Sequence, residues 1–194
     1  MTKKIYVQVP TSVVRNEGVF IDNGSFMLYV RLCYLYFRNY KNEEISFLHK
    51  VMMQKLFIKD SRTFKKRLNV LFENNLIKNK IEQLPRTKPV TVILNKEILT
   101  EKTFTQVNVN IFNYLDQIDE HAFRLLFYYK SHINLDVLDR DFCFVSFRTL
   151  QEQLKMGSTT ISRANKQLQE KNLIKIFLMI RRPPRSTLFP YTTL

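Results

Sequence analysis

The chain has 194 residues and carries 31 Lys and Arg against 17 Asp and Glu, which gives a formal net charge of +14. A positive charge of this size favours a polyanionic partner. The longest apolar stretch, residues 26–37, is interrupted by Arg31 and is shorter than the ~18–20 residues that a membrane span needs. No secretory segment follows Met1. We therefore expect a cytoplasmic protein that does not contact membranes.

The sequence offers no set of residues typical of a catalytic or metal site. Its three histidines, His49, His121 and His132, stand at no metal-ligand spacing from one another or from a cysteine. Cys33 and Cys143 lie in separate apolar segments without a CxxC pattern, which indicates buried free thiols. A glycine-rich phosphate loop is also missing. We therefore expect no catalysis, no metal and no cofactor.

The first half of the chain predicts short strands and helices in alternation. Apolar and polar residues alternate near the start, and apolar residues then recur at helical spacing in three segments. The expected strands cover residues 5–9 and 43–48, and the expected helices cover residues 25–39, 49–57 and 61–74.

Beyond the third helix, two β-rich runs flank a loop with a proline at each end. The runs cover residues 76–84 and 90–94, and the loop covers residues 85–89. Proline fixes its own backbone angle and removes an N–H donor, so this loop is expected to stand out of the sheet. The pattern predicts a β-hairpin wing with Arg86 and Lys88 at its tip.

The second half predicts the same order of elements after a linker over residues 95–103. This linker has neither Gly nor Pro, so we expect the two halves to keep a restricted orientation. The expected strands cover residues 104–109 and 142–145, the expected helices cover residues 120–133 and 146–154, and an acidic loop covers residues 135–141.

The most informative pattern follows these elements. A short helix, a Gly-bearing turn over residues 155–157 and a second helix beginning at Ser158 form a predicted helix-turn-helix. The Ser158 hydroxyl is expected to cap the second helix by accepting one of its free N–H groups. Ile161, Ala164 and Leu168 draw one apolar stripe along this helix. The opposite face carries only hydroxyls and cations, namely Thr159, Ser162, Arg163 and Lys166.

The same pattern occurs earlier in the chain, at a shift of 97 residues (158 − 61). Residues 61–78 align with residues 158–175 without a gap, and the same shift pairs Asp22 with Asp119. The identical pairs are Ser61/Ser158, Thr63/Thr160, Leu71/Leu168, Glu73/Glu170, Asn75/Asn172, Leu76/Leu173, Ile77/Ile174 and Lys78/Lys175. A register of this length indicates a tandem repeat of one domain. The two domains are expected over residues 1–97 and 98–176.

Positive charge is concentrated in the first repeat. Residues 1–97 hold 18 Lys and Arg against 8 acids, a net +10, whereas residues 98–194 hold 13 against 9, a net +4. Polar residues that recur at helical spacing on the helix before the wing are Arg62, Lys65, Lys66 and Asn69. Such faces are most often merely solvated, but this one carries no acid and precedes a basic wing. We therefore expect it to contact phosphates.

A helix-turn-helix followed by a basic wing resembles the winged-helix domains of DNA-binding proteins, and the resemblance covers residues 19–78 and 116–175. Two such domains in one chain resemble the replication initiators of plasmids and phages. The resemblance implies an α+β, mostly helical fold with two tandem winged-helix domains that bind double-stranded DNA through both recognition helices. It leaves open a homodimer and contacts with other replication proteins. The residues expected to contact DNA are Arg62, Thr63, Lys65, Lys66, Asn69, Arg86, Lys88, Ser158, Thr159, Thr160, Ser162, Arg163 and Lys166.

Two other functions fit the same pattern. A helix-turn-helix transcriptional regulator would use the same surface, and a winged-helix protein-interaction module would use the fold as a scaffold. Directly repeated sites in the neighbouring DNA would favour an initiator, whereas one palindrome in a promoter would favour a regulator. A weak or salt-insensitive DNA footprint would favour the interaction module.

The last segment, residues 177–194, departs from the repeat. It has no acidic residue and no periodicity, and it contains Pro183 and Pro184 in succession. The segment resembles a translated sequencing adapter, which implies that the native sequence is interrupted inside the second wing. A basic tail that contacts DNA is the alternative.

Overall fold

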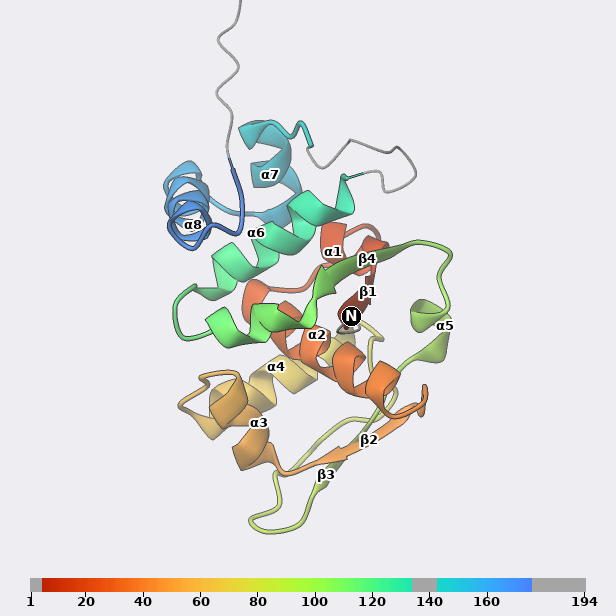
Figure 1. The fold of residues 1–194 in the computed structure, drawn as a ribbon. Helices are drawn as coiled ribbons and strands as arrows, with labels where there is room; N and C mark the ends of the chain where they lie inside the picture. The colour runs from red at the N-terminus through yellow and green to blue at the C-terminus, as the bar shows by residue number, and fades with distance from the viewer. Residues whose placement is uncertain (1–4, 134–142, 176–194) are drawn as a thin grey trace, which may run out of the picture.

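Figure 1 shows the fold in a computed structural model that describes residues 5–133 and 143–175. In chain order, the elements are β1 (Tyr6–Pro10), α1 (Thr11–Arg15), α2 (Asn23–Arg38), β2 (Glu44–Phe47), α3 (His49–Lys55), α4 (Ser61–Glu73), β3 (Val90–Ile93), α5 (Lys96–Leu99), β4 (Phe104–Asn108), the 3-10 helix η1 (Val109–Tyr114), α6 (Glu120–Ser131), α7 (Phe147–Leu154) and α8 (Ser158–Glu170). Helices and two small antiparallel sheets confirm the predicted α+β class. Within the described residues, no helix has the length and apolar character needed to cross a bilayer. The predicted acidic loop and the segment 177–194 lie outside the described residues.

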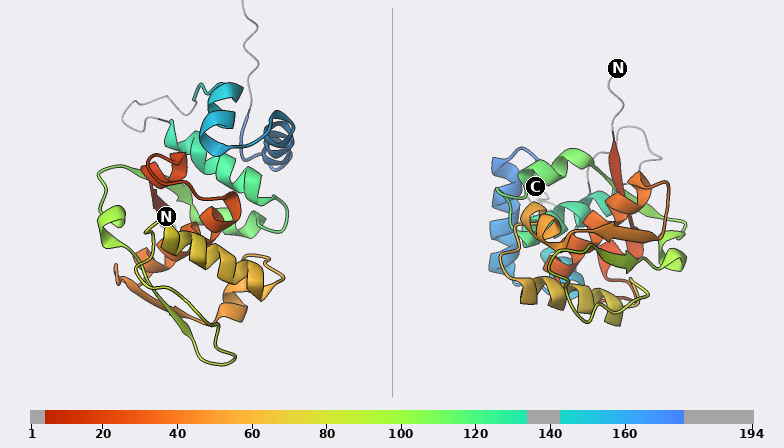
Figure 2. Two further views of the ribbon diagram at one scale, coloured as in Figure 1. Left: turned by 180° about the vertical axis from the view of Figure 1, so that it is seen from behind. Right: turned by 90° about the horizontal axis from the view of Figure 1, so that it is seen from below.

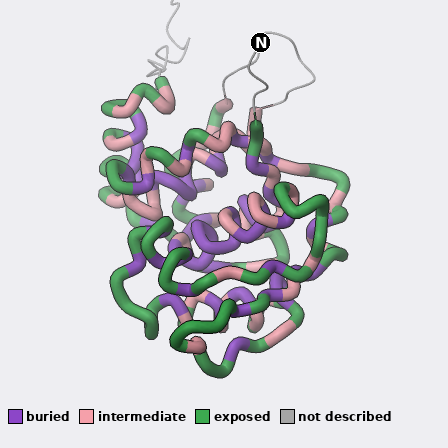
Figure 3. Tube along the Cα trace, turned by 60° about the horizontal axis from the view of Figure 1, so that its bottom comes forward, coloured by how far each residue is buried: buried purple, intermediate pink, exposed green. Residues whose placement is uncertain are grey.

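The centre of the molecule is a pair of packed helices, α2 and α6. α4 packs against α2 and α8 packs against α6, so the order across the molecule is α8, α6, α2 and α4 (Figure 1 and Figure 2). Aromatic rings join the central pair, with the Phe26 ring centroid 5.5 Å from that of Phe127 and 6.3 Å from that of Phe123. Each helix begins after an aspartate, Asp22 or Asp119, whose carboxylate accepts backbone N–H groups of the first turn. Buried residues gather along these central helices (Figure 3).

A strand from each half joins the two halves directly. β1 pairs with β4 in antiparallel register, with Gln8 opposite Gln106. These two residues are 98 apart (106 − 8), close to the repeat shift, so the strands are related by a local two-fold axis through this pair. The strands predicted at residues 5–9 and 104–109 are confirmed. The predicted linker, residues 95–103, contains the short helix α5.

Each half contains two helices joined by a short turn, as predicted: α3 and α4 in the first half, α7 and α8 in the second. α4 (Ser61–Glu73) and α8 (Ser158–Glu170) have the same bounds under the shift of 97 (158 − 61). The turns differ by one residue, because Phe57 and Lys155, which share a left-handed backbone (φ 54° and 52°), are 98 apart (155 − 57). The repeat register is therefore interrupted at this turn, which the ungapped alignment of the sequence does not show.

The prediction of a strand over residues 76–84 is wrong. In this described segment only an isolated bridge forms, at Ile77, while β3 pairs with β2. The Asn79 side chain takes the place of backbone pairing, because its amide donates to the Thr91 carbonyl and its oxygen accepts the Ile93 N–H. A side chain thus ends the pairing before the proline-bounded loop begins.

Two predictions for the second half are also corrected. Residues 143–145, the described part of the strand predicted over residues 142–145, form no strand. In the first half β2 pairs with β3, which follows α4, and the described residues after α8 contain no strand that could pair in the same way. The N-cap of α8 is Gly157, not Ser158, because Gly157 has the extended backbone of a cap and its carbonyl accepts the Ile161 N–H.

Candidate nucleic-acid interface

The outward face of α4 carries most of the side chains predicted to contact phosphates in the first half. Arg62, Thr63 and Lys66 are exposed, whereas Lys65 and Asn69 are half-buried. The inward stripe of the helix is formed by the buried residues Phe64, Leu68 and Leu71. Arg62 and Lys66 are therefore the most accessible cations of this helix, and Lys65 and Asn69 are less accessible than the sequence pattern implies.

An acid lies at the start of this face. Asp60 caps α4, and its Oδ2 accepts both the backbone N–H and the hydroxyl proton of Thr63. Backbone N–H groups of Arg62 and Thr63 lower the pKa of the Asp60 carboxyl. A negative charge at a helix N-terminus stabilises the helix, but it also repels a phosphate. Thr63 is thus engaged by the cap, whereas the cations Arg62, Lys65 and Lys66 remain the phosphate-binding candidates of α4.

The proline-bounded loop of residues 85–89 follows the first helix pair and exposes Arg86 and Lys88. In Figure 1 it lies at the lower end of the molecule, where the chain leads into β3. Both predicted side chains are therefore accessible. The expected β-hairpin does not form, and this loop and the isolated bridge at Ile77 stand in its place.

The outward face of α8 is polar over most of its length. Of the side chains predicted to contact DNA, Ser158, Thr159, Ser162, Arg163 and Lys166 are exposed and Thr160 is half-buried; Gln169 and Glu170 at the end of the helix are exposed as well. The Lys166 Nζ lies 3.9 Å from a carboxylate oxygen of Glu170, one turn further on. Gly157 caps α8 and has no side chain to bond the free N–H groups of the first turn. These backbone N–H groups can therefore receive an anion.

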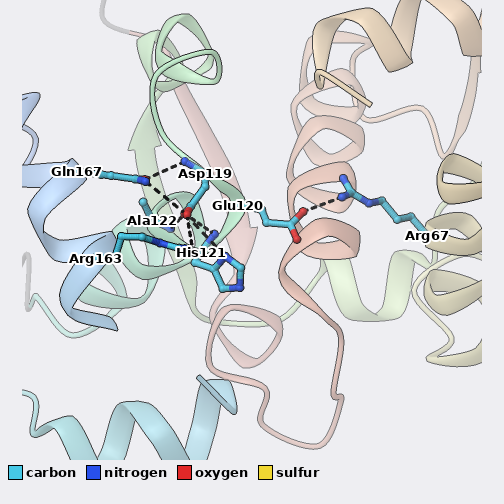
Figure 4. A network of polar contacts seen from close by, with 7 residues as sticks. All are labelled: Arg67, Asp119, Glu120, His121, Ala122, Arg163 and Gln167. Atoms are coloured by element: carbon cyan, nitrogen blue, oxygen red, sulfur yellow. Dashed lines mark hydrogen bonds and ion pairs between the residues drawn. The ribbon is translucent and has the colours of Figure 1, made fainter. Parts of the chain in front are cut away.

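Arg163 is held by an acid from another helix. Its Nη2 lies 3.2 Å from Oδ2 of Asp119, the N-cap of α6 (Figure 4). Gln167, one turn further along α8, donates to the same oxygen at 3.4 Å and accepts the Asp119 N–H at 3.0 Å. The Arg163 side chain nevertheless remains 60% exposed. Arg163, which is expected to contact DNA, is thus accessible and paired at the same time.

A second arginine, Arg67, ties α4 to the same end of α6. Its Nη2 lies 2.6 Å from Oε2 of Glu120, and its side chain is only 16% exposed. The guanidinium also lies against the backbone of Gly24 in α2, where an added Cβ would come within 2.4 Å of it. The sequence signal for this inward position is that Arg67 stands three residues after Phe64, beside the apolar stripe. Arg67 is therefore a packing residue.

The fully buried Arg124 of α6 holds α1 against the second half. Its Nη2 donates to the Val13 carbonyl and to Oδ1 of Asn16, both at 2.7 Å, and its Nε donates to the Val14 carbonyl at 3.1 Å. The guanidinium lies 3.9 Å from the centroid of the Phe26 ring. Burial lowers its pKa, while the three oxygens stabilise the charged form. In the sequence this arginine has no feature that separates it from a solvated one.

The cysteines are free thiols, as predicted. Cys33 is buried and Cys143 is half-buried, and desolvation raises the pKa of both. Among the described residues, no group of three His, Cys, Asp or Glu side chains could hold a metal ion.

Comparisons with protein-family models, with curated proteins and with solved structures gave no match to this chain. Its function must therefore be argued from its own residues and their arrangement.

Proposed function

We propose that this chain binds double-stranded DNA through two tandem winged-helix domains, residues 1–97 and 98–176, and acts as a plasmid or phage replication initiator. The observation that carries the proposal is the pair of equivalent helices, α4 and α8, whose exposed faces hold hydroxyls and cations. Their only exposed acids, Glu73 and Glu170, stand at the last residue of each helix. We call α4 and α8 the recognition helices from here on.

The packing order supports joint binding by the two recognition helices. α8 packs on α6, α6 on α2, and α2 on α4. Each packed pair of helices has its axes ~8–10 Å apart, so three successive contacts separate the outer axes by about 24–30 Å at most. One turn of DNA is ~34 Å long, and the recognition side chains extend outward from both axes. The exposed faces of the two helices are therefore separated by a distance of the same order as one turn of DNA, which supports binding to neighbouring turns.

The two halves would contribute differently to DNA binding. The first repeat is the more basic, with a net +10 over residues 1–97, and its accessible cations Arg62, Lys66, Arg86 and Lys88 suit phosphates. The second recognition helix exposes Thr159, Ser162 and Arg163, side chains that can hydrogen-bond base edges as well as phosphates. The first half would therefore supply most of the sequence-independent affinity and the second half most of the discrimination.

A salt titration of duplex binding by the full chain tests this proposal. If Arg62, Lys65, Lys66, Arg86 and Lys88 each neutralise a phosphate, log K should fall with log[salt] at a slope of roughly −4 to −5, because each contact contributes about −0.9. Fluorescence anisotropy with a labelled duplex of about three turns, ~30 base pairs, measures this slope. Binding that is absent, or that does not change with salt, would contradict the proposal and favour a protein-interaction module.

A further inference from the structure

Two adjacent acids at the start of α6 each bind an arginine from a different recognition helix (Figure 4). Asp119 Oδ2 lies 3.2 Å from Nη2 of Arg163 in α8. Glu120 Oε2 lies 2.6 Å from Nη2 of Arg67 in α4. The N-terminus of α6 is therefore a point of attachment for both helices that the proposed function assigns to DNA.

The two ion pairs differ in what else the arginine could reach. Arg67 is 16% exposed and lies against Gly24 of α2, so it cannot contact a duplex while α4 stays packed. Arg163 is 60% exposed and belongs to the same outward face as Ser162 and Lys166. Of these two arginines, therefore, only Arg163 is exposed enough to bind either the Asp119 carboxylate or a DNA phosphate.

The two oxygens of Asp119 do different things. Oδ1 caps α6 by accepting the backbone N–H groups of His121 at 3.0 Å and Ala122 at 2.8 Å. Oδ2 faces the Arg163 guanidinium and the Gln167 amide. A substitution of Asp119 that keeps one acceptor oxygen but removes the charge should therefore retain the cap of α6 and weaken the contact with Arg163.

In the first repeat, the equivalent carboxylate accepts its hydrogen bonds from a different donor. Asp22, which is 97 residues before Asp119 (119 − 22), accepts both the backbone N–H and the hydroxyl of Ser25, the latter at 2.6 Å. The residue equivalent to Ser25 is Ala122 (122 − 25 = 97), which has no hydroxyl. Without that internal donor, Oδ2 of Asp119 is available to Arg163. The pairing is therefore a specific feature of the second repeat.

We propose that Asp119 restrains Arg163 in the free protein and competes with a DNA phosphate for it, which makes Asp119 an affinity-determining residue of the second recognition helix. This inference rests on the proposed DNA binding. A phosphate that approaches Arg163 must displace a charge-assisted contact and meets a like charge behind it. Both effects lower the affinity for DNA, so removing the charge of Asp119 should raise it.

The test is Asp119→Asn in the full chain, measured by anisotropy with the ~30 base-pair duplex. Asparagine caps helices as well as aspartate does, so the fold should be retained. Exposed ion pairs are weak, so we expect about two- to five-fold tighter binding. The salt slope should steepen by about 0.9, the value of one additional phosphate contact. Asp119→Ser also keeps a capping oxygen and should have the same effect.

The neighbouring acid provides a matched control. Glu120→Gln makes the same change in net charge one residue away, but it removes the charged partner of Arg67, whose side chain is only 16% exposed. It should lower the unfolding midpoint without tightening DNA binding. If Glu120→Gln tightens binding as much as Asp119→Asn, a general change in net charge explains the effect and the restraint is contradicted. In an Arg163→Ala background, Asp119→Asn should lose most of its effect and should no longer steepen the salt slope, since the cation that Asp119 holds is gone and only the repulsion by its charge is removed.

The outcomes separate the two proposals. A wild-type chain that binds no duplex contradicts the proposed function, and the restraint with it. A wild-type chain that binds, with folded Asp119→Asn and Asp119→Ser variants that bind equally or more weakly, contradicts the restraint alone. Asp119 would then position α8 for binding and would not compete with DNA.

Discussion

Replacing Arg62, Lys65 and Lys66 together by alanine is expected to weaken duplex binding by about 10²- to 10³-fold at 0.1 M salt and to flatten the salt slope by about 2.7. The reason is that each neutralised phosphate releases condensed counterions, and the gain grows as the salt concentration falls. Arg67 is left in place because its guanidinium pairs with Glu120 inside the molecule. The measurement is a salt titration of the wild-type and variant chains on the same duplex.

A matched variant controls for the loss of three charges. Lys41, Lys96 and Lys102 are exposed and lie outside both helix pairs and the proline-bounded loop. Replacing these three by alanine removes the same net charge, but it should change the salt slope by less than one contact, about 0.9. Equal effects of the two triple variants would show that only net charge matters, and would remove α4 from the interface.

Arg124→Ala is expected to destabilise the protein by about 3–5 kcal/mol. The substitution removes the Arg124 donors from the carbonyls of Val13 and Val14 and from the side-chain oxygen of Asn16. It also leaves a space beside the Phe26 ring, over which the guanidinium lies at 3.9 Å. Unfilled space and unpaired buried acceptors both destabilise a folded state. Urea unfolding followed by circular dichroism gives the free energy of unfolding.

Arg148→Ala is the control for this substitution. The Arg148 side chain is 87% exposed, and its ion pair is with Glu152 on its own helix, so its loss should cost less than about 0.5 kcal/mol. A loss below about 1 kcal/mol for Arg124→Ala would show that α1 does not depend on this arginine, and that the attachment of α1 to α6 has another source.

The helices were predictable because apolar residues recur at helical spacing, as Ile161, Ala164 and Leu168 do in α8. The absence of a strand over residues 76–84 was not predictable, since it depends on the Asn79 side chain reaching two backbone groups of β3. Strand patterns record which residues are apolar, and they do not record which donors and acceptors a neighbouring side chain occupies.

The exposed members of the candidate interface were also predictable, since helical periodicity assigns Arg62 and Arg163 to an outward face. Their partners were not. The pairing of Arg163 with Asp119 joins residues 44 positions apart (163 − 119), and it depends on how α8 packs on α6. The internal position of Arg67 has a weak signal beside the apolar stripe, whereas the burial of Arg124 has none.

Hydroxyl-radical footprinting of the full chain on a duplex that contains its preferred site tests whether both recognition helices contact DNA at once. Two helices about one helical turn apart should protect about two turns, ~20 base pairs, on one face. The triple substitution in α4 should remove one protected turn, and a Thr159/Ser162/Lys166→Ala variant of α8 should remove the other. Protection of a single turn that the α8 substitutions leave unchanged would contradict binding by two tandem domains.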